Sequence, residues 1–169
     1  FRSVIQDDPF HSGSKLCCIP TPEIDTAIIH AQMASPDGTV RIMGASFQDV
    51  DIAMAAKHTI VSCEELVDNE EIRRHPELNA LTGLCVDAVV HAPCGAHPSQ
   101  CFNYYDYDSQ YYLMYDRVSR TQEEFDKFIE EYVNDCPTHM EYLNKIGAAR
   151  LQELKIKLGY GYVPGLKRR

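Results

Sequence analysis

Two short, nearly continuous apolar runs constrain the fold of this chain more than any other feature of its sequence. They cover Thr26–Gln32 (TAIIHAQ) and Thr59–Cys63 (TIVSC). Runs of this length that do not alternate with polar residues are typical of buried strands in a parallel sheet. We therefore predict an α/β fold with an open, mostly parallel sheet built around these two segments.

Weaker signals predict the neighbouring elements of the sheet. Further strands are expected at Lys15–Ile19, Thr39–Met43 and Cys85–His91. Asp49–His58 has apolar residues at helical spacing, with Asp49 and Asp51 as its expected caps, and Glu64–Arg74 fits either irregular chain or a short helix. Strand, hairpin, helix and strand in this order favour parallel pairs joined by right-handed crossovers.

The last third of the chain is predicted to be helical. Thr121-x-x-Glu124 and Thr138-x-x-Glu141 have the pattern of capping boxes. Apolar residues at three- and four-residue spacing follow each, and the second helix is expected to continue to about Lys157. Gln110–Val118 is expected to be partly helical. We thus expect an α/β portion over residues 1–108 and a helical extension, packed on it, over residues 109–169.

Composition excludes several classes of function. The formal net charge is −9, whereas nucleic-acid binding needs a basic face. No apolar run approaches the ~20 residues that cross a bilayer, and no signal-peptide pattern is visible, so neither nucleic acid nor a membrane is an expected partner. Seven cysteines without a secretion signal indicate reduced thiols and a cytoplasmic location. Four of them lie in apolar runs and are expected to be buried: Cys17, Cys18, Cys63 and Cys85.

One group of histidines and cysteines has the spacing of a metal site. It is His91-x-x-Cys94-x-x-His97, followed by Cys101. Imidazole and thiolate ligands at such spacing suit zinc. Two prolines and a glycine lie between these residues, however, and alternating strand geometry would direct the side chains differently. We therefore expect no metal here.

Three blocks of sequence resemble a known family. They are Ile24–Ile42 (IDTAIIHAQMASPDGTVRI), Asp51–Val67 (DIAMAAKHTIVSCEELV) and Val86–Asp108 (VDAVVHAPCGAHPSQCFNYYDYD). In order and spacing they resemble the A subunits of the family I CoA-transferases, and the resemblance extends through Glu141–Leu151. Those subunits are about twice as long as this chain. The resemblance therefore implies that the chain corresponds to the C-terminal half of an A subunit, whose N-terminal half is missing.

The resemblance implies a CoA-transferase that acts as a complex of A and B subunits. Such an enzyme moves CoA between a dicarboxylate (glutaconate or similar) and a small acid such as acetate, in bacterial amino-acid fermentation. The substrates are an acyl-CoA thioester and a carboxylic acid, and no cofactor is bound permanently. The glutamate that forms the glutamyl-CoA thioester belongs to the B subunit, so no catalytic residue is expected in this chain. Two alternatives stay open: a hydrolase of acyl-CoA thioesters or ring-opened CoA substrates on the same fold, and a scaffold fragment without activity of its own.

The loop formed by Gly95, Ala96, His97 and Pro98 is the best candidate for a substrate-binding or interface site. It follows a predicted strand, where polar groups are often presented at a cleft. Gly95 would let the backbone approach a ligand or partner closely, and His97 could bind a carboxylate or a pantetheine amide. The alternative is a rigid loop at a contact between subunits, in which the backbone satisfies His97.

Other polar residues are secondary candidates. Tyr104 and Tyr105 begin a tyrosine-rich segment that is predicted either to line an interface or to form a solvent-facing rim. His30 and Gln32, at the end of a buried strand, are either ligands or hydrogen-bonded core groups. Glu64–Glu65 follows the next predicted strand and has the appearance of a carboxylate pair. We expect these two glutamates to have structural roles or to lie on the surface.

Overall fold

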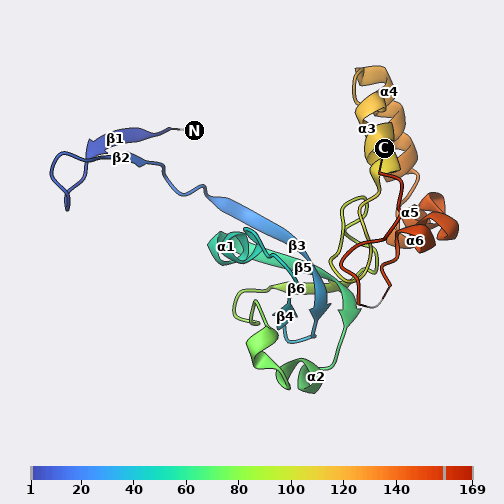
Figure 1. Cartoon of the computed structure of the whole chain (residues 1–169), viewed down its shortest axis with the longest axis horizontal. Helices are drawn as coiled ribbons and strands as arrows, with labels where there is room; N and C mark the ends of the chain where they lie inside the picture. Colours follow the sequence, from blue (N-terminus) through green and yellow to red (C-terminus); the bar gives the residue numbers. More distant parts are fainter. Residues whose placement is uncertain (1, 158, 169) are drawn as a thin grey trace.

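The computed structural model describes residues 2–157 and 159–168 of the chain. Near the N-terminus, β1 (Val4–Asp7) and β2 (Lys15–Cys18) form an antiparallel hairpin. This hairpin extends away from the rest of the chain (Figure 1). The remainder consists of a four-stranded sheet and a group of C-terminal helices at one end of it.

The sheet has the strand order β4-β3-β5-β6. Its strands are β3 (Ile24–Ala34), β4 (Val40–Arg41), β5 (Ala56–Leu66) and β6 (Ala88–His91). The pairs β3–β5 and β5–β6 are parallel, and only the short β4 runs antiparallel to its neighbour β3. The prediction of an α/β fold with a mostly parallel sheet is confirmed.

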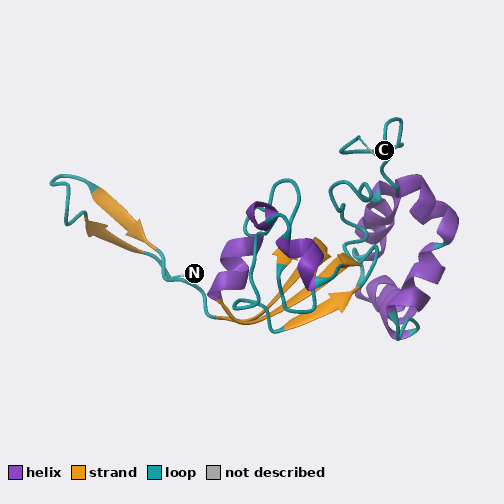
Figure 2. Cartoon of the chain, turned by 90° about the horizontal axis from the view of Figure 1, so that it is seen from below, coloured by secondary structure: helices purple, strands orange, loops and turns teal. Residues whose placement is uncertain are grey.

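Helices between the strands cover one side of this sheet. α1 (Asp49–Ala55) precedes β5, while α2 (Asn69–Arg73) and the 3₁₀-helix η1 (Pro76–Leu78) lie between β5 and β6. All of them lie on the same side of the strands (Figure 2). The core is formed on this side by residues that alternate along the strands, together with contributions from α1 and the β4 region: Ile29, Ala31, Ala34, Val40, Ala53, Val61, Cys63 and Leu81.

Several boundaries differ from the prediction. β3 and β5 pair beyond their apolar runs, whereas β4 and β6 are shorter than the strands predicted at Thr39–Met43 and Cys85–His91. The helix expected over Asp49–His58 ends at Ala55, since Ala56 already pairs with Ile24 of β3. β5 continues to Leu66, so Glu64 and Glu65 lie within the strand instead of following it. The expected capping by Asp49 and Asp51 is also wrong: both lie in the first turn, and the N-cap is Gln48, without a side-chain cap bond.

The C-terminal helices are α3 (Ser109–Val118), α4 (Gln122–Ile129), the π-helical η2 (Glu130–Asn134), α5 (His139–Ile146) and α6 (Ala148–Leu154). The capping box at Thr138 is confirmed. At Thr121 the hydroxyl does accept the N–H of Glu124, but the Glu124 carboxylate binds that hydroxyl in return. The single helix expected to reach Lys157 is wrong, because Gly147, with φ of 90°, separates α5 from α6.

The cysteines are all free thiols. Cys63 is buried as predicted, and Cys18 and Cys85 are half-buried. Cys17 is exposed, contrary to the prediction, because its strand β2 pairs only with β1 in the projecting hairpin. Within residues 2–157 and 159–168, no helix has the length and apolar character needed to cross a membrane.

Candidate functional site

The carboxyl-terminal parts of β3 and β5 bring a histidine next to a buried glutamate. The Glu64 side chain is only 4% exposed, and its Oε1 lies 2.6 Å from His30 Nε2. The same oxygen accepts the hydroxyl of Tyr105 at 2.8 Å, and Oε2 accepts the backbone N–H of Cys94 at 2.8 Å. Donors from three separate segments therefore converge on one carboxylate.

These contacts keep Glu64 ionised. Burial alone would raise the pKa of Glu64, but hydrogen bonds from His30, the Cys94 N–H and Tyr105 outweigh it, so the pKa is lowered. Burial and the adjacent Glu64 charge raise the pKa of Tyr105, which stays a protonated donor. With both oxygens occupied, Glu64 is built to hold its surroundings in place and is poorly placed to attack a substrate.

The Glu64 network fixes the loop that the sequence singled out. Glu64 binds the N–H of Cys94, and the Tyr105 hydroxyl accepts the N–H of Ala96 at 2.9 Å. Gly95 lies between these two anchors and packs on His30. A Cβ on Gly95 would come within 2.9 Å of the His30 ring and 2.7 Å of a backbone oxygen. The close approach expected of Gly95 is therefore made here to a side chain of the same protein.

His97, from the same loop, belongs to a second buried cluster. Its Nδ1 lies 2.6 Å from the Tyr142 hydroxyl, and its Nε2 lies 3.2 Å from Asp108 Oδ2. Arg150 binds both carboxylate oxygens of Asp108, at 2.6 and 3.0 Å. Asp108 is also the N-cap of α3. This cluster thus joins the loop to α3, α5 and α6.

The charges in this second cluster compensate one another. Burial alone would raise the pKa of Asp108, but Arg150, the first amides of α3 and His97 lower it to about 2. Burial lowers the pKa of His97, and this outweighs the opposite effect of Asp108. At neutral pH the cluster therefore contains an ion pair between Asp108 and Arg150 beside a neutral imidazole.

The other candidate residues occupy separate positions. Gln32 is a hydrogen-bonded core group here: its Oε1 accepts the N–H of Met43 at 2.8 Å, and its Nε2 donates to the carbonyls of Met43 and Phe102 at 3.3 Å. The Tyr104 hydroxyl donates to Glu65 at 2.8 Å. The carbonyl of Pro98 accepts the N–H of Asp108.

The spacing considered for a metal does not assemble one set of ligands. His91 Nε2 faces the carbonyl of Glu64 at 3.1 Å, whereas His97 lies in the Asp108 cluster. His30, Glu64 and Cys101 do have ligand atoms within 4.8 Å of one another. Burial, however, raises the pKa of Cys101 to about 12, which favours a neutral thiol over the thiolate that a metal requires.

A cavity of about 420 Å³ opens beside the Glu64 network. It lies beyond the carboxyl-terminal part of β5, where open α/β sheets commonly bind ligands. Its lining combines that network with α6 and the residues around it: Glu64, Glu65, Pro93, Cys94, Tyr104, Tyr105, Ala148, Leu151, Gln152 and Lys155. The cavity therefore combines apolar walls with one lysine and two carboxylates.

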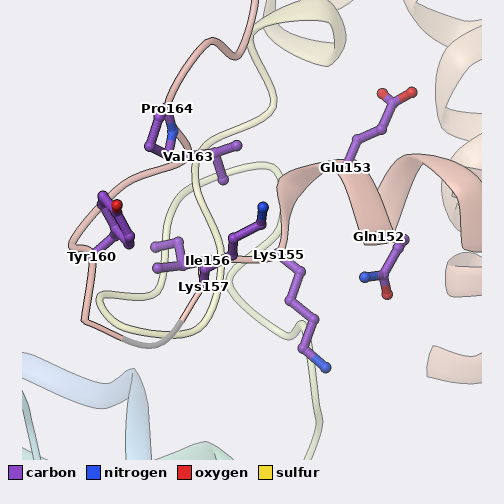
Figure 3. A pocket seen from close by; sticks show the side chains of 8 residues that line it. All are labelled: Gln152, Glu153, Lys155, Ile156, Lys157, Tyr160, Val163 and Pro164. Atoms are coloured by element: carbon purple, nitrogen blue, oxygen red, sulfur yellow. The ribbon is translucent and has the colours of Figure 1, made fainter.

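A second cavity, of about 580 Å³, lies between the end of α6 and the C-terminal segment (Figure 3). It shares Gln152 and Lys155 with the first. In Figure 3, Lys155 and Lys157 leave the chain in opposite directions, so one backbone segment offers an ammonium group on either side. The sequence did not indicate Lys155, because the lysine follows α6 without any motif.

Comparison with known proteins gives consistent matches. The family profile described as Coenzyme A transferase matches residues 11–92. The chain is 61% identical, over 92% of its length, to the A subunit of glutaconate CoA-transferase from Acidaminococcus fermentans. It is 34% identical, over 84% of its length, to the A subunit of 3-oxoadipate CoA-transferase from Pseudomonas knackmussii. It covers 49% of each of these relatives.

The solved structure of glutaconate coenzyme A-transferase from Acidaminococcus fermentans superposes with a TM-score of 0.91 and 59% identity. The match covers 95% of this chain and 51% of the solved one. The chain therefore spans about half the length of the relatives that it matches. The fold is that of the CoA-transferase type.

Proposed function

We propose that this chain is half of the A subunit of a glutaconate CoA-transferase-like enzyme. The premise is that it belongs to the coenzyme A transferase family, whose profile matches its residues 11–92. The observation that carries the proposal is 61% identity, over 92% of the chain, to the A subunit of such an enzyme. The complete enzyme would move CoA between a dicarboxylate, such as glutaconate, and a small acid, such as acetate.

We propose that this chain shapes the site while a partner B subunit supplies the attacking glutamate. The occupied oxygens of Glu64 support this division, since a nucleophilic carboxylate needs a free oxygen. Tyr104 and Tyr105 would line part of one wall of the cleft, and the Gly95–Pro98 loop would hold that wall in place through the bond from the Ala96 N–H to the Tyr105 hydroxyl. His30 and Glu64 would position that loop, and Lys155 would attract the carboxylate or phosphate groups of the substrates.

The setting of this enzyme is part of the same proposal. We propose a cytoplasmic bacterial hetero-oligomer that serves amino-acid fermentation, with coenzyme A entering as a thioester substrate and no cofactor bound permanently. Within the chain, residues 1–108 would contribute the α/β part and residues 109–169 the helical extension. The position of Asp108 as the N-cap of α3 supports a division there.

A single assay tests the reaction. The full-length A subunit would be combined with its B partner, and loss of glutaconyl-CoA would be followed with and without acetate. We expect loss that depends on acetate and yields acetyl-CoA, and no turnover by this chain alone. Acetate-independent loss with release of free CoA would identify a hydrolase instead, and no loss in either condition would contradict the assigned substrate.

A further inference from the structure

Two segments of the chain pair with each other beside the 420 Å³ cavity. Tyr105 of one segment and Lys155 of the other are direct antiparallel partners. The side chains of such partners leave the backbone on the same side, and both of these side chains line the cavity. The position of Lys155 at the cavity therefore depends on this pairing. Two backbone hydrogen bonds of 2.9 Å flank it: from the Asp106 N–H to the Leu154 carbonyl, and from the Ile156 N–H to the Tyr104 carbonyl.

Lys155 has a distinct place among the charged groups of this region. It is the one cationic side chain among the described residues that line the 420 Å³ cavity, and it also lines cavities of about 580 and 620 Å³. The two carboxylates of the lining, Glu64 and Glu65, already accept tyrosine hydroxyls. The substrates of the proposed enzyme are anions, so their binding depends most on where the Lys155 ammonium is held.

The C-terminal segment of the chain holds this pairing through Asp106. We call residues 159–168 the strap, which passes the end of α6 (Figure 3). The Asp106 side chain is buried, its Oδ2 accepts the N–H of Val163 at 2.9 Å, and the same oxygen forms an ion pair with Arg168. The Arg168 guanidinium also donates to the carbonyl of Val163 at 3.2 Å. Asp106 thus has its N–H in the pairing and its carboxylate in the strap.

The strap has further contacts on either side of this ion pair. Gly161 packs on the Phe102 ring, which a Cβ at Gly161 would approach within 2.9 Å. The hydroxyl of Ser109 donates to the carbonyl of Lys167 at 3.1 Å. Leu166 packs against the buried cluster to which Tyr105 and Leu154 belong. The strap is therefore attached along its length to the segment that precedes α3.

The ion pair with Arg168 is the contact on which this arrangement depends most. A buried carboxylate that loses its cationic partner is strongly destabilising, so loss of the Arg168 charge should displace Asp106 and loosen the pairing that it flanks. We infer that Asp106 and Arg168 are positioning residues, which fix the Lys155 ammonium at the cavity wall, where it binds the anionic group of a substrate. This inference rests on the proposed function, because it takes the substrates to be those of a CoA-transferase.

Hydrogen exchange in the full-length A subunit tests the positioning without reference to the reaction. Arg168→Gln removes the charge from the buried pair, while Arg120→Gln removes the same charge from the exposed pair with Asp116 and is the control. We expect Arg168→Gln to speed exchange about tenfold or more at the amides of Asp106 and Ile156, and Arg120→Gln to leave both unchanged. Arg168→Lys keeps the charge without the planar guanidinium. It should give a smaller increase, and it provides the comparison if Arg168→Gln does not fold.

Steady-state kinetics of the complete enzyme, with its B partner, test whether Arg168 acts through Lys155. Lys155→Met removes one charge-assisted contact, and we expect it to raise the KM for glutaconyl-CoA about tenfold. Arg168→Gln should raise the same KM about threefold to fivefold and leave kcat nearly unchanged, because it weakens binding alone. The double variant should have the KM of Lys155→Met, since residues that act as a unit are not additive.

Two results would overturn the inference. One is unchanged exchange at the amides of Asp106 and Ile156 in Arg168→Gln, whatever reaction the enzyme catalyses. The other is a double variant in which the two effects on KM multiply, because Arg168 would then act by a route other than Lys155. Faster exchange at both amides in an enzyme that transfers no CoA would support the positioning of Lys155 and contradict only the assigned reaction.

Discussion

Two buried histidine–carboxylate pairs lie at the same loop, and they differ in what completes them. His97 and Asp108 are joined by Arg150, which neutralises the carboxylate and ties it to α6. His30 and Glu64 are completed by neutral donors, a tyrosine hydroxyl and a backbone N–H. The Asp108 carboxylate is neutralised and lies outside the lining of the 420 Å³ cavity, which suits a role in holding the fold together. Glu64 is an anion held by neutral donors within that lining, which suits a role in shaping a site.

The largest loss of stability should appear when Asp108 is replaced. Asp108→Ala removes the buried partner of the largely buried Arg150, leaves it only the exposed Glu153, and removes the side-chain cap of α3. We expect the free energy of unfolding to fall by about 3–5 kcal/mol, measured by urea denaturation. The control, Asp116→Ala, removes only an exposed ion pair with Arg120, and we expect a loss of about 0.5 kcal/mol or less. Equal losses would contradict the structural role of the Asp108 cluster.

Replacing Glu64 should lower the free energy of unfolding by less than replacing Asp108, and its effect should be confined to the loop that Glu64 holds. Glu64→Gln keeps the shape but weakens the hydrogen bonds from His30, Cys94 and Tyr105, and we expect a loss of about 1–3 kcal/mol. Faster hydrogen exchange at the amide of Cys94 should accompany this loss. Glu65→Gln, on the exposed neighbour, is the control. A variant with unchanged exchange would show that Glu64 does not hold the loop.

Variants of the two adjacent tyrosines should distinguish the contribution of a buried hydrogen bond from that of an exposed one. Tyr105→Phe removes the acceptor for the Ala96 N–H, and we expect a loss of about 1–2 kcal/mol. Tyr104→Phe removes only a bond to the exposed Glu65, so about 0.5 kcal/mol or less is expected. Thermal unfolding of both variants measures the difference, and the reverse order would place the loop anchor at Tyr104.

The smallest expected effect is a pH dependence that belongs to His97. As the pH falls through its ordinary value of 6.5, His97 takes up a proton in the unfolded chain but not yet in the folded one, where its pKa is lowered. Unfolding therefore binds a proton, and stability is lost as the pH falls below 6.5. For one group the slope stays below about 1.4 kcal/mol per pH unit.

Urea unfolding between pH 7 and pH 5 measures this slope. The pKa values of Glu64 and Asp108 are lowered from 4.5 and 3.8, so their contributions fall below this range. His97→Gln should flatten the dependence, while His11→Gln, in the projecting hairpin, should not. An unchanged slope in His97→Gln would assign the titration to another group.

The sheet was predictable from the sequence, but the network around Glu64 was not. Apolar runs are local signals, and Ile28 and Val61 lie in strands that such runs indicated. Glu64, in contrast, is 34 positions from His30 and 41 from Tyr105, and the meeting with His30 depends on the register of β3 against β5. No local pattern encodes that register.

The helices show the same limit at closer range. Thr138 and Glu141 form a capping box because both partners lie within one turn. The separation of α5 from α6 was missed because Gly147 interrupts an apolar spacing that continues on both sides of it. The contact of Arg150 with Asp108, 42 positions away, depends on tertiary packing that the spacing does not describe.

The register of the parallel strands also affects how fast the chain can fold. Ile24 pairs with Ala56 and Ala34 with Leu66, so each β3–β5 contact closes the same loop of 32 residues. Contacts between residues this far apart in the sequence form only after the chain has lost the entropy of loop closure. This slows folding relative to helices, whose contacts are local. We expect α3 to α6 to gain structure before the sheet does. During that delay the apolar strands stay exposed to aggregation.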